Sequence, residues 1–479
     1  MLGHFTYFDD FGNLSLIIYA KIKEKRTKNC VINLNFYCFN AMIQSGIKLG
    51  LRFYFHLFLV LASITCCFPS QAQTASNDTL SLSINEMEGL FFKNNLQIIA
   101  QRYNINYAEA QIITAKLFLN PQFSVSNGLY NTDNNRFLDV SKVTGEQSAS
   151  LSQEFYTAGR RLKGIEVAKS GVQLAKFQFL DMVRSLKFSL RSNFYNIYFQ
   201  QESAKVYNFE IKSLTDILTA YKTQYAKGNI AQKELLRLQS QLYSLKVELA
   251  NLQVGIDTTQ TRLKILTRIS PDAYILPRYK YDIAEKETVT KVPYQQLLDS
   301  SYTNRFDLRY AQGAVNYNRL NLELQKALAV PDLTVSLSYD KFGSYIRDYN
   351  SIGIGLPLTI FNRNQGVIKQ AKIAITQSDV LLESSLQRIE SSINISYKTA
   401  LRYESVYNTF DSDFRDNYTH LIQEVSKNYA KKNISLLSFL DFYESYRSNS
   451  LLLNNIELNK VVSLEQLNFV TGTPFFNQK

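Results

Sequence analysis

The sequence predicts an α+β membrane protein in which a unit of long helices and a β-hairpin occurs twice. Three observations support this fold class. Proline is absent from residues 122–270 and 358–473, windows of 149 and 116 residues, and since proline breaks helix interiors, these windows permit very long helices. Short segments of alternating apolar and polar residues lie between the helical patterns, and landmarks of the first half recur in the second half.

Two long amphipathic patterns cover residues 160–225 and 365–428, which are rich in Leu, Lys, Gln, Glu, Ala and Ser. At the rise of an α-helix, each predicted helix would extend about 100 Å. A compact globular domain does not accommodate helices of this length. We therefore expect them to pack against one another in a coiled-coil-like layer.

Four segments between the helices predict strands. Residues 333–340 alternate strictly, with Leu333, Val335, Leu337 and Tyr339 on one face and Thr, Ser and Asp on the other. Similar alternation occurs at 352–360 and, more loosely, at 123–130 and 149–156, which flank a polar loop at 132–139. A half-buried sheet on a soluble core would show the same pattern. Very long flanking helices and a predicted export signal favour the strands of a membrane barrel, apolar toward lipid and polar toward the lumen.

The duplication is visible in residues that recur at a fixed distance. Three landmarks in the first half lie 210 residues before their counterparts, namely Asn94 and Asn304, Lys116 and Lys326, and Pro121 and Pro331. The segment 225–230 recurs at 429–434, a displacement of 204. The chain therefore divides into a first repeat at 73–269, a connecting segment at 270–293 with three prolines, and a second repeat at 294–479.

Four predicted strands are too few to close a transmembrane barrel. An open sheet edge is not tolerated in lipid, because its backbone groups would lack hydrogen-bond partners. Several copies of the chain are therefore expected to complete the barrel together.

An apolar run at residues 53–68 predicts a cleavable secretory signal. Lys48 and Arg52 precede the run, and Ala72 ends a small-x-small site before Gln73. Its sixteen residues are fewer than the roughly 20 that a membrane-spanning helix needs. We therefore expect cleavage rather than a retained membrane span.

Residues 1–72 are thus expected to be an N-terminal extension and signal peptide. Because signals normally begin at the N-terminus, Met42 is a candidate for the true start. A lipid anchor at Cys66 or Cys67 is a second reading, which Thr65 before the cysteine disfavours.

Cleavage after Ala72 would remove most of the residues that bind metals or act as nucleophiles. All four cysteines and two of the three histidines lie upstream, which leaves His420 as the only histidine. No Gly-rich phosphate loop follows a predicted strand. We expect no enzyme activity, no cofactor and no resident metal site. The net charge of +12 comes from interleaved charges without a run of five like ones, so a nucleic-acid partner is not expected either.

Several segments carry a resemblance to a known family. They are the predicted helix at 94–121, LSQEFYTAGRR at 151–161, LPLTIFNRNQG at 356–366, and the two Tyr-Ala-Lys turns. On these residues the chain resembles the TolC-type outer membrane efflux proteins from about residue 82 to 472. The segment 356–366 and the Gly-Arg-Arg at 159–161 look most like the branch that serves cobalt-zinc-cadmium or copper-silver exporters.

The resemblance implies a homotrimer with a 12-stranded β-barrel in the lipid of the cell outer membrane, continuous with a periplasmic α-helical tunnel. It implies the function of an exit duct in a tripartite efflux system that exports metal cations or small toxic compounds. The implied partners are a periplasmic adaptor protein and an inner membrane resistance-nodulation-division pump. Two alternatives are a duct for type I protein secretion and a structural coiled-coil protein of the envelope.

The resemblance also implies site residues at the two helix-helix turns, which adaptor subunits grip in this family. The docking tips would be Ala226, Lys227, Gly228, Asn229 and Ile230 in the first turn and Ala430, Lys431, Lys432, Asn433 and Ile434 in the second. Gly228 matches the family's glycine, whereas Lys432 replaces it in the second turn. The simpler reading is that both are turns only, with Gly228 as a C-cap.

A closed aperture near the tips is a further implication. By position, Tyr429 resembles a linking tyrosine, Glu234 an acidic partner and Asp441 a residue of an acidic ring. Ser438 and Ile434 stand where other members carry an acid and its basic partner. We therefore expect a weaker or differently built lock, although Glu234 and Asp441 could also be ordinary solvated residues.

Overall fold

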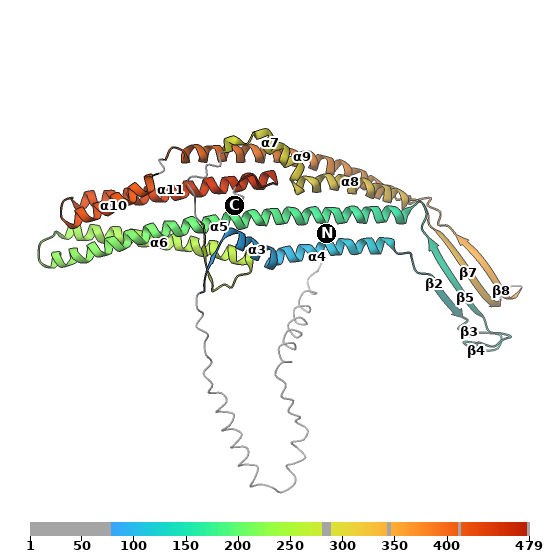
Figure 1. Ribbon diagram of the computed structural model, residues 1–479. Helices are drawn as coiled ribbons and strands as arrows, with labels where there is room; N and C mark the ends of the chain where they lie inside the picture. The colour runs from blue at the N-terminus through green and yellow to red at the C-terminus, as the bar shows by residue number, and fades with distance from the viewer. Residues whose placement is uncertain (1–77, 280–288, 343–345, 411–412, 477–479) are drawn as a thin grey trace, which may run out of the picture. The chain divides into compact units, whose positions relative to one another are not determined.

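The computed structural model describes residues 78–279, 289–342, 346–410 and 413–476. The chain separates into two units, Met1–Ser76 and Asn77–Lys479, and all of the described residues belong to the second (Figure 1). The predicted signal at 53–68, the candidate start Met42, and both Cys66 and Cys67 lie outside the described residues.

The first half of the second unit consists of helices, strands and one very long helix. The elements before the sheet are β1 (Thr79–Leu82), α3 (Ile84–Asn94) and α4 (Leu96–Lys116). The strands that follow are β2 (Gln122–Asn127), β3 (Tyr130–Asn131), β4 (Arg136–Phe137) and β5 (Gln147–Phe155). The closing elements are α5 (Arg160–Ala226), α6 (Gln232–Thr267) and β6 (Tyr274–Pro277).

The second half shows a similar order of elements. It begins with the 3-10 helix η1 (Val289–Lys291), α7 (Tyr294–Asn304) and α8 (Phe306–Ala327). The strands are β7 (Leu333–Phe342) and β8 (Arg347–Gly355), and the last helices are α9 (Gln365–Tyr407), α10 (Phe414–Ala430) and α11 (Leu436–Thr471). Helices α3 and α7 have 11 residues each, and α6 and α11 have 36 each.

The prediction of a single helix over 160–225 is confirmed by α5, which has 67 residues. The prediction of a continuous helix over 365–428 is wrong, because α9 ends at Tyr407 and α10 begins at Phe414. Asn408 and Thr409 follow Tyr407, and the Thr409 hydroxyl donates a hydrogen bond of 2.6 Å to the Val406 carbonyl. Short polar side chains of this kind compete for the helix's backbone groups, which favours an end.

The predicted helix over 94–121 is shorter than expected at both ends. Asn95 is the N-cap of α4, where its side-chain oxygen accepts a hydrogen bond from the Ile98 amide at 3.0 Å. Its side-chain amide also donates to the Leu266 carbonyl at 2.9 Å. An asparagine cap ends one helix and starts the next, so α3 and α4 are separate helices.

Two strand predictions also need correction. The strand expected at 352–360 is β8, Arg347–Gly355, which stops before Pro357 because proline has no backbone N–H for the ladder. The loop expected at 132–139 contains β4, which pairs with β3 through Tyr130 and Phe137. The parallel pairing of β1 with β6 was not predicted; it joins the start of this unit to the connecting segment.

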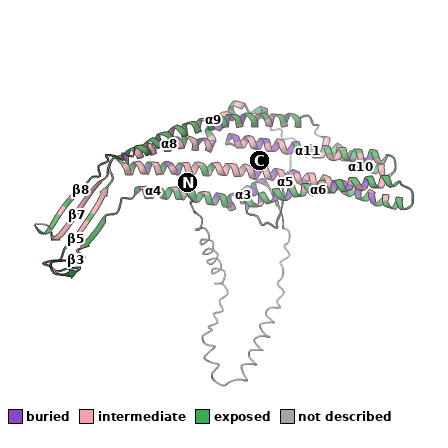
Figure 2. Cartoon of the chain, turned by 180° about the vertical axis from the view of Figure 1, so that it is seen from behind, coloured by how far each residue is buried: buried purple, intermediate pink, exposed green. Residues whose placement is uncertain are grey.

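The main sheet has four strands in the order β2-β5-β7-β8, all antiparallel (Figure 1). The pairing of β5 with β7 unites the two halves of the chain in one sheet. Strands β2 and β8 lie at the edges and are mostly exposed, whereas β5 and β7 are mostly half-buried (Figure 2).

The two faces of this sheet differ sharply in chemistry. One face, called here the hydroxyl face, carries Ser124, Ser126, Ser148, Ser150, Ser152, Ser336, Ser338 and Ser351. Three pairs of these hydroxyls share hydrogen bonds of 2.6 to 2.7 Å across the strands. The other face, called here the apolar face, presents side chains that are 54 to 73% exposed, namely Phe123, Val125, Leu337, Ile352 and Ile354. This agrees with the predicted alternation at 333–340.

Helix α5 is the central element of the helical layer and packs against α4, α6, α8 and α11. A cluster of buried residues near its middle includes Leu190, Phe194 and Ile197 and extends to Phe91 of α3 and Leu263 of α6. A second cluster lies further toward its C-terminus and is described with the tips below. No helix among the described residues combines the length and the apolar character needed to cross a membrane.

Candidate docking tips and aperture

The first predicted tip is a Schellman turn that ends α5. The amide of Gly228 donates to the Tyr225 carbonyl at 2.9 Å, and the amide of Asn229 donates to the Gln224 carbonyl at 3.0 Å. Gly228 has φ +76°, the left-handed conformation that such a turn requires at this position. Lys227 is exposed beside it. The turn is therefore fixed by backbone bonds, and its outer side chains remain accessible.

The second predicted tip has the same backbone geometry despite its different sequence. The amide of Lys432 donates to the Tyr429 carbonyl at 2.9 Å, and the amide of Asn433 donates to the Asn428 carbonyl at 2.9 Å. Lys432 has φ +62°. Lysine in place of glycine thus leaves the turn unchanged in shape, at the roughly 1 to 2 kcal/mol that a side chain costs in the left-handed region.

The asparagines at the two tips make matching side-chain bonds. The Asn229 amide donates to the Gln224 side-chain oxygen at 2.8 Å, and the Asn433 amide donates to the Asn428 side-chain oxygen at 3.3 Å. The flanking Ala226 and Ala430 are both exposed. The two turns therefore present similar surfaces of small and basic side chains.

Ile230 and Ile434 are half-buried and not fully exposed. Ile434 packs against the tip cluster, a buried group of Leu, Tyr, Phe, Ile and Val side chains from α5, α6, α10 and α11. Packing within the chain accounts for Ile434 without a partner protein. The accessible charged side chains of the tips are instead Lys227, Lys431 and Lys432.

Tyr429 of α10 links the helix pair α10 and α11 to the helix pair α5 and α6, just behind the tips. Its hydroxyl donates a hydrogen bond to the hydroxyl of Tyr221, and the two rings stack with centroids 6.3 Å apart. It also stacks on Phe439 at 4.3 Å. Burial raises the pKa of the Tyr429 phenol well above its usual value, and the bond to Tyr221 and the charge of Glu234 act in the same direction. Tyr429 therefore stays neutral and able to donate at any physiological pH.

The other predicted aperture residues are placed differently. Glu234 is half-buried in the first turn of α6 and close enough to Tyr429 to affect its pKa. Asp441 is exposed on α11, and Ser438 is exposed near the start of that helix, where its amide donates to the N-cap Ser435 at 3.1 Å. Glu234 thus contributes to the electrostatic environment of Tyr429, whereas Asp441 is exposed on its helix. The aperture roles of all three stay predictions.

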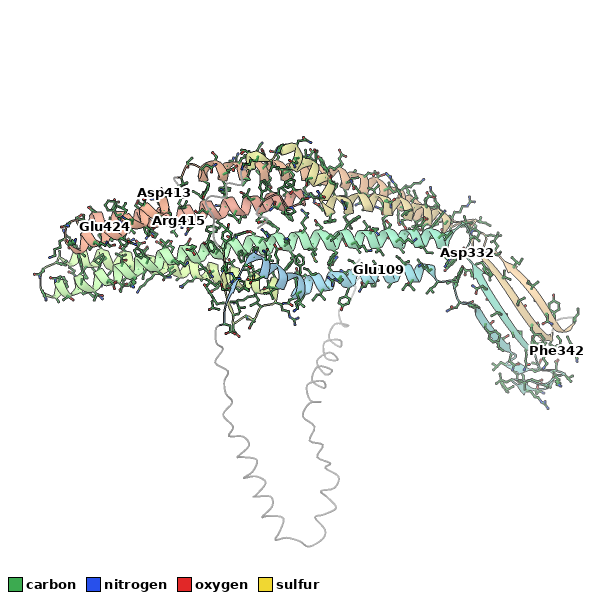
Figure 3. The ribbon with its side chains drawn as sticks, in the orientation of Figure 1. Glu109, Asp332, Phe342, Asp413, Arg415 and Glu424 are labelled. Carbon is green, nitrogen blue, oxygen red and sulfur yellow. The ribbon has the colours of Figure 1, made fainter. Side chains whose placement is uncertain are left out.

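Sequence reasoning missed Tyr221 as the partner of Tyr429. The repeat aligns Tyr429 with Tyr225, one helical turn away from Tyr221, and Tyr225 is 41% exposed. The sequence held one signal for this partner, because Tyr221 lies four residues before Tyr225 and residues four apart on a helix share a face. Helix α10 also carries Glu424 and Arg415 (Figure 3). Glu424 pairs with Lys427 at 2.7 Å, and Arg415 contacts Glu457 of α11 at 2.7 Å.

Across the described ranges, no three His, Cys, Asp or Glu side chains gather in a way that could hold a metal ion. The arrangement instead offers a sheet with one apolar and one hydroxyl face, a layer of long helices, and two matching turns.

Comparison with known proteins gives the chain relatives of one kind. Residues 90–267 match the family model of the outer membrane efflux protein. The cobalt-zinc-cadmium resistance protein CzcC of Cupriavidus metallidurans is 21% identical over 317 residues, which cover 66% of this chain and 70% of CzcC.

Solved structures share the fold at low sequence identity. The CmeC outer membrane channel of Campylobacter jejuni matches with a TM-score of 0.66 and 16% identity, covering 83% of this chain and 87% of CmeC. CusC matches with a TM-score of 0.65 and 16% identity, covering 84% of this chain and 96% of CusC. The open MtrE channel of Neisseria gonorrhoeae matches at 0.60 and 16%, covering 85% and 96%. The chain is thus similar to the outer membrane efflux protein family, whose model matches residues 90–267, and to the heavy-metal efflux branch represented by CzcC.

Proposed function

We propose that the chain is the outer membrane exit duct of a tripartite efflux system and that it exports metal cations or other small toxic compounds. The observation that carries this proposal is the four-stranded sheet. Its exposed apolar face suits lipid, and its hydroxyl face suits an aqueous lumen. A structural coiled-coil protein has no need for such a sheet.

Completion of the barrel by other copies follows from the sheet's two edges. Strands β2 and β8 each have one neighbour in the sheet, and lipid does not tolerate an unpaired strand edge. Pairing β8 of one copy with β2 of the next would satisfy both edges. Three copies, the number that the family resemblance implies, would give a barrel of 12 strands.

Metal cations are the proposed cargo because CzcC is named as a cobalt-zinc-cadmium resistance protein. A duct needs no resident metal site, since the pump selects the cargo. We expect cells that lack this chain to become sensitive to Co²⁺, Zn²⁺ or Cd²⁺ and to accumulate the ion, with both effects reversed by the intact gene. Unchanged growth and metal content would contradict metal export, and loss of a secreted protein instead would favour the type I secretion duct.

The tips are the proposed docking surface for a periplasmic adaptor and, through it, an inner membrane resistance-nodulation-division pump. Their backbone geometry is fixed, and Lys227 and Lys431 are exposed on matching turns. Such a surface suits a partner with acidic or carbonyl groups.

We expect the double variant Lys227→Glu, Lys431→Glu to assemble normally but to lose crosslinking to the adaptor. It reverses the charge of the first turn and cancels that of the second, where Lys432 remains, without touching the packed cluster. Photo-crosslinking in cells measures this directly. The matched control is Lys246→Glu, an exposed lysine on α6 away from the turn. Adaptor crosslinking equal in both proteins would exclude the tip lysines from docking.

Tyr429 is the proposed link that keeps the aperture closed. We expect Tyr429→Phe to raise the basal conductance of the channel in planar bilayers, because it removes a hydrogen bond with a net contribution of about 0.5 to 1.5 kcal/mol. Tyr225→Phe is the control at the repeat-related position, where the side chain is partly exposed. A Tyr429→Phe channel as silent as the control would mean that this bond does not hold the aperture.

A further inference from the structure

A buried carboxylate lies between the helices behind the tips. Glu210 of α5 is only 1% exposed. Its nearest counter-ion is Arg447 of α11, with 3.6 Å between Glu210 Oε2 and Arg447 Nη1, which is too long for a hydrogen bond. Within the described residues, neither of these two atoms has a hydrogen-bond partner. A buried, ionised carboxylate without such bonds is costly.

The surrounding charges do not compensate for this burial. Arg447 is shared with a second carboxylate, that of Glu248 on α6, at 3.8 Å. Glu444 of α11 adds a third negative charge nearby. Burial raises the pKa of the Tyr207 phenol on α5, and the charges of Glu248 and Glu210 add to the rise. The carboxyl groups of Glu210, Glu248 and Glu444 thus share the single positive charge of Arg447. This excess of negative charge favours a proton bound to Glu210.

Further from the tips, polar side chains at the contact between α5 and α11 have hydrogen-bond partners. Arg191 makes two bonds of 2.8 Å to Glu465, and Asn454 donates to Ser203 at 3.1 Å. Compared with these contacts, the pair of Glu210 and Arg447 lacks hydrogen bonds between its facing atoms, and it lies nearer to the tips.

We propose that Glu210 is a proton-binding site in the helical layer, and that its protonation keeps α11 packed against α5 behind the tips. When the proton leaves, the buried charge favours local separation of the two helices, which lets water reach the carboxylate. The ligand is a proton from the surrounding solution, and no other co-reactant is needed.

The direction of the pH dependence follows from burial. Burial raises the pKa of Glu210 to about 7, and the charges of Glu248 and Glu444 add to the rise, whereas Arg447 opposes it. The packed state therefore binds the proton more tightly than a separated, solvated state with the ordinary pKa of 4.5. The packing is most stable in acid and weakens as the pH rises through about 7.

Hydrogen–deuterium exchange of the full chain in detergent tests this site. Between pH 6 and pH 8, the local opening equilibrium of segments 204–214 and 441–450 should rise on the order of tenfold after correction for intrinsic exchange. The segment around Arg191, whose charges are paired, should show no such change. Equal protection of segments 204–214 and 441–450 at the two pH values would overturn the proposal.

A variant then assigns the effect to one residue. Glu210→Gln cannot ionise, so its segments should stay protected at both pH values. Glu248→Gln is the matched control, because that side chain is 38% exposed, and it should keep a clear pH dependence. A pH dependence that persists in Glu210→Gln would also overturn the proposal. If that variant does not fold, the comparison of segments within the unaltered protein decides alone.

Discussion

Replacing Arg191 by alanine is expected to lower the free energy of unfolding by about 3 to 5 kcal/mol, the range for removing one partner of a buried ion pair. Arg191 is buried on α5 and contacts Glu465 at 2.8 Å and Glu88 at 2.7 Å. Glu465 is only 3% exposed. The variant would leave Glu465 in a poorly solvated place without this cation, whereas Glu88 would keep Lys187 at 3.0 Å.

An exposed pair provides the matched control for this prediction. Arg278 contacts Glu86 at 2.8 Å, but both side chains are about half exposed. Ion pairs of this kind contribute about 0 to 1 kcal/mol, so Arg278→Ala should have little effect. Denaturant unfolding of the detergent-solubilised protein measures both variants. Similar losses would mean that burial does not set the strength of the Arg191 contacts.

The second large effect is expected at the apolar face of the sheet. Leu337 pairs with Leu151 and Ile352 in neighbouring strands and is 54% exposed. If this face meets lipid, Leu337→Arg places a charge in the membrane at a cost of about 2 to 4 kcal/mol near its midplane. We expect the variant to be made but to fail to insert, as judged by its content in outer membrane fractions.

The adjacent residue serves as the control for sheet facing. Ser336 lies on the hydroxyl face of the same strand, opposite Ser152 and Gly353. An arginine there would point into an aqueous lumen, so Ser336→Arg should insert at close to the normal level. Equal insertion of the two variants, or the reverse order, would contradict the assignment of the faces.

Much of the fold could be predicted because its main signals are long and periodic. The proline-free window that contains α5 and the alternation in β7 each extend over many residues, so local exceptions do not hide them. The end of α9 at Tyr407 could not be predicted with the same ease. The two residues that follow it, Asn408 and Thr409, are short and polar and are neither proline nor glycine, and such residues also occur inside helices.

The two turns could be predicted for a similar reason, while their role in docking stays a prediction. Both tips follow from short turn sequences, which the repeat makes visible. The partner of Tyr429 is Tyr221, and the pairing depends on how two hairpins pack, which one chain segment does not reveal. Glu210 and Arg447 were not singled out, since burial of a charged residue on an amphipathic helix is set by its neighbours in space.

The central claim, that several copies close one barrel, is tested most directly by crosslinking the two sheet edges. Ser124 of β2 and Ser351 of β8 lie on the same row of the hydroxyl face, and residues 73–479 contain no cysteine. A short bis-maleimide applied to membranes with the Ser124→Cys, Ser351→Cys variant should give covalent trimers, while each single variant stays monomeric. A product that stays monomeric, or a ladder that continues beyond three copies, would contradict the account.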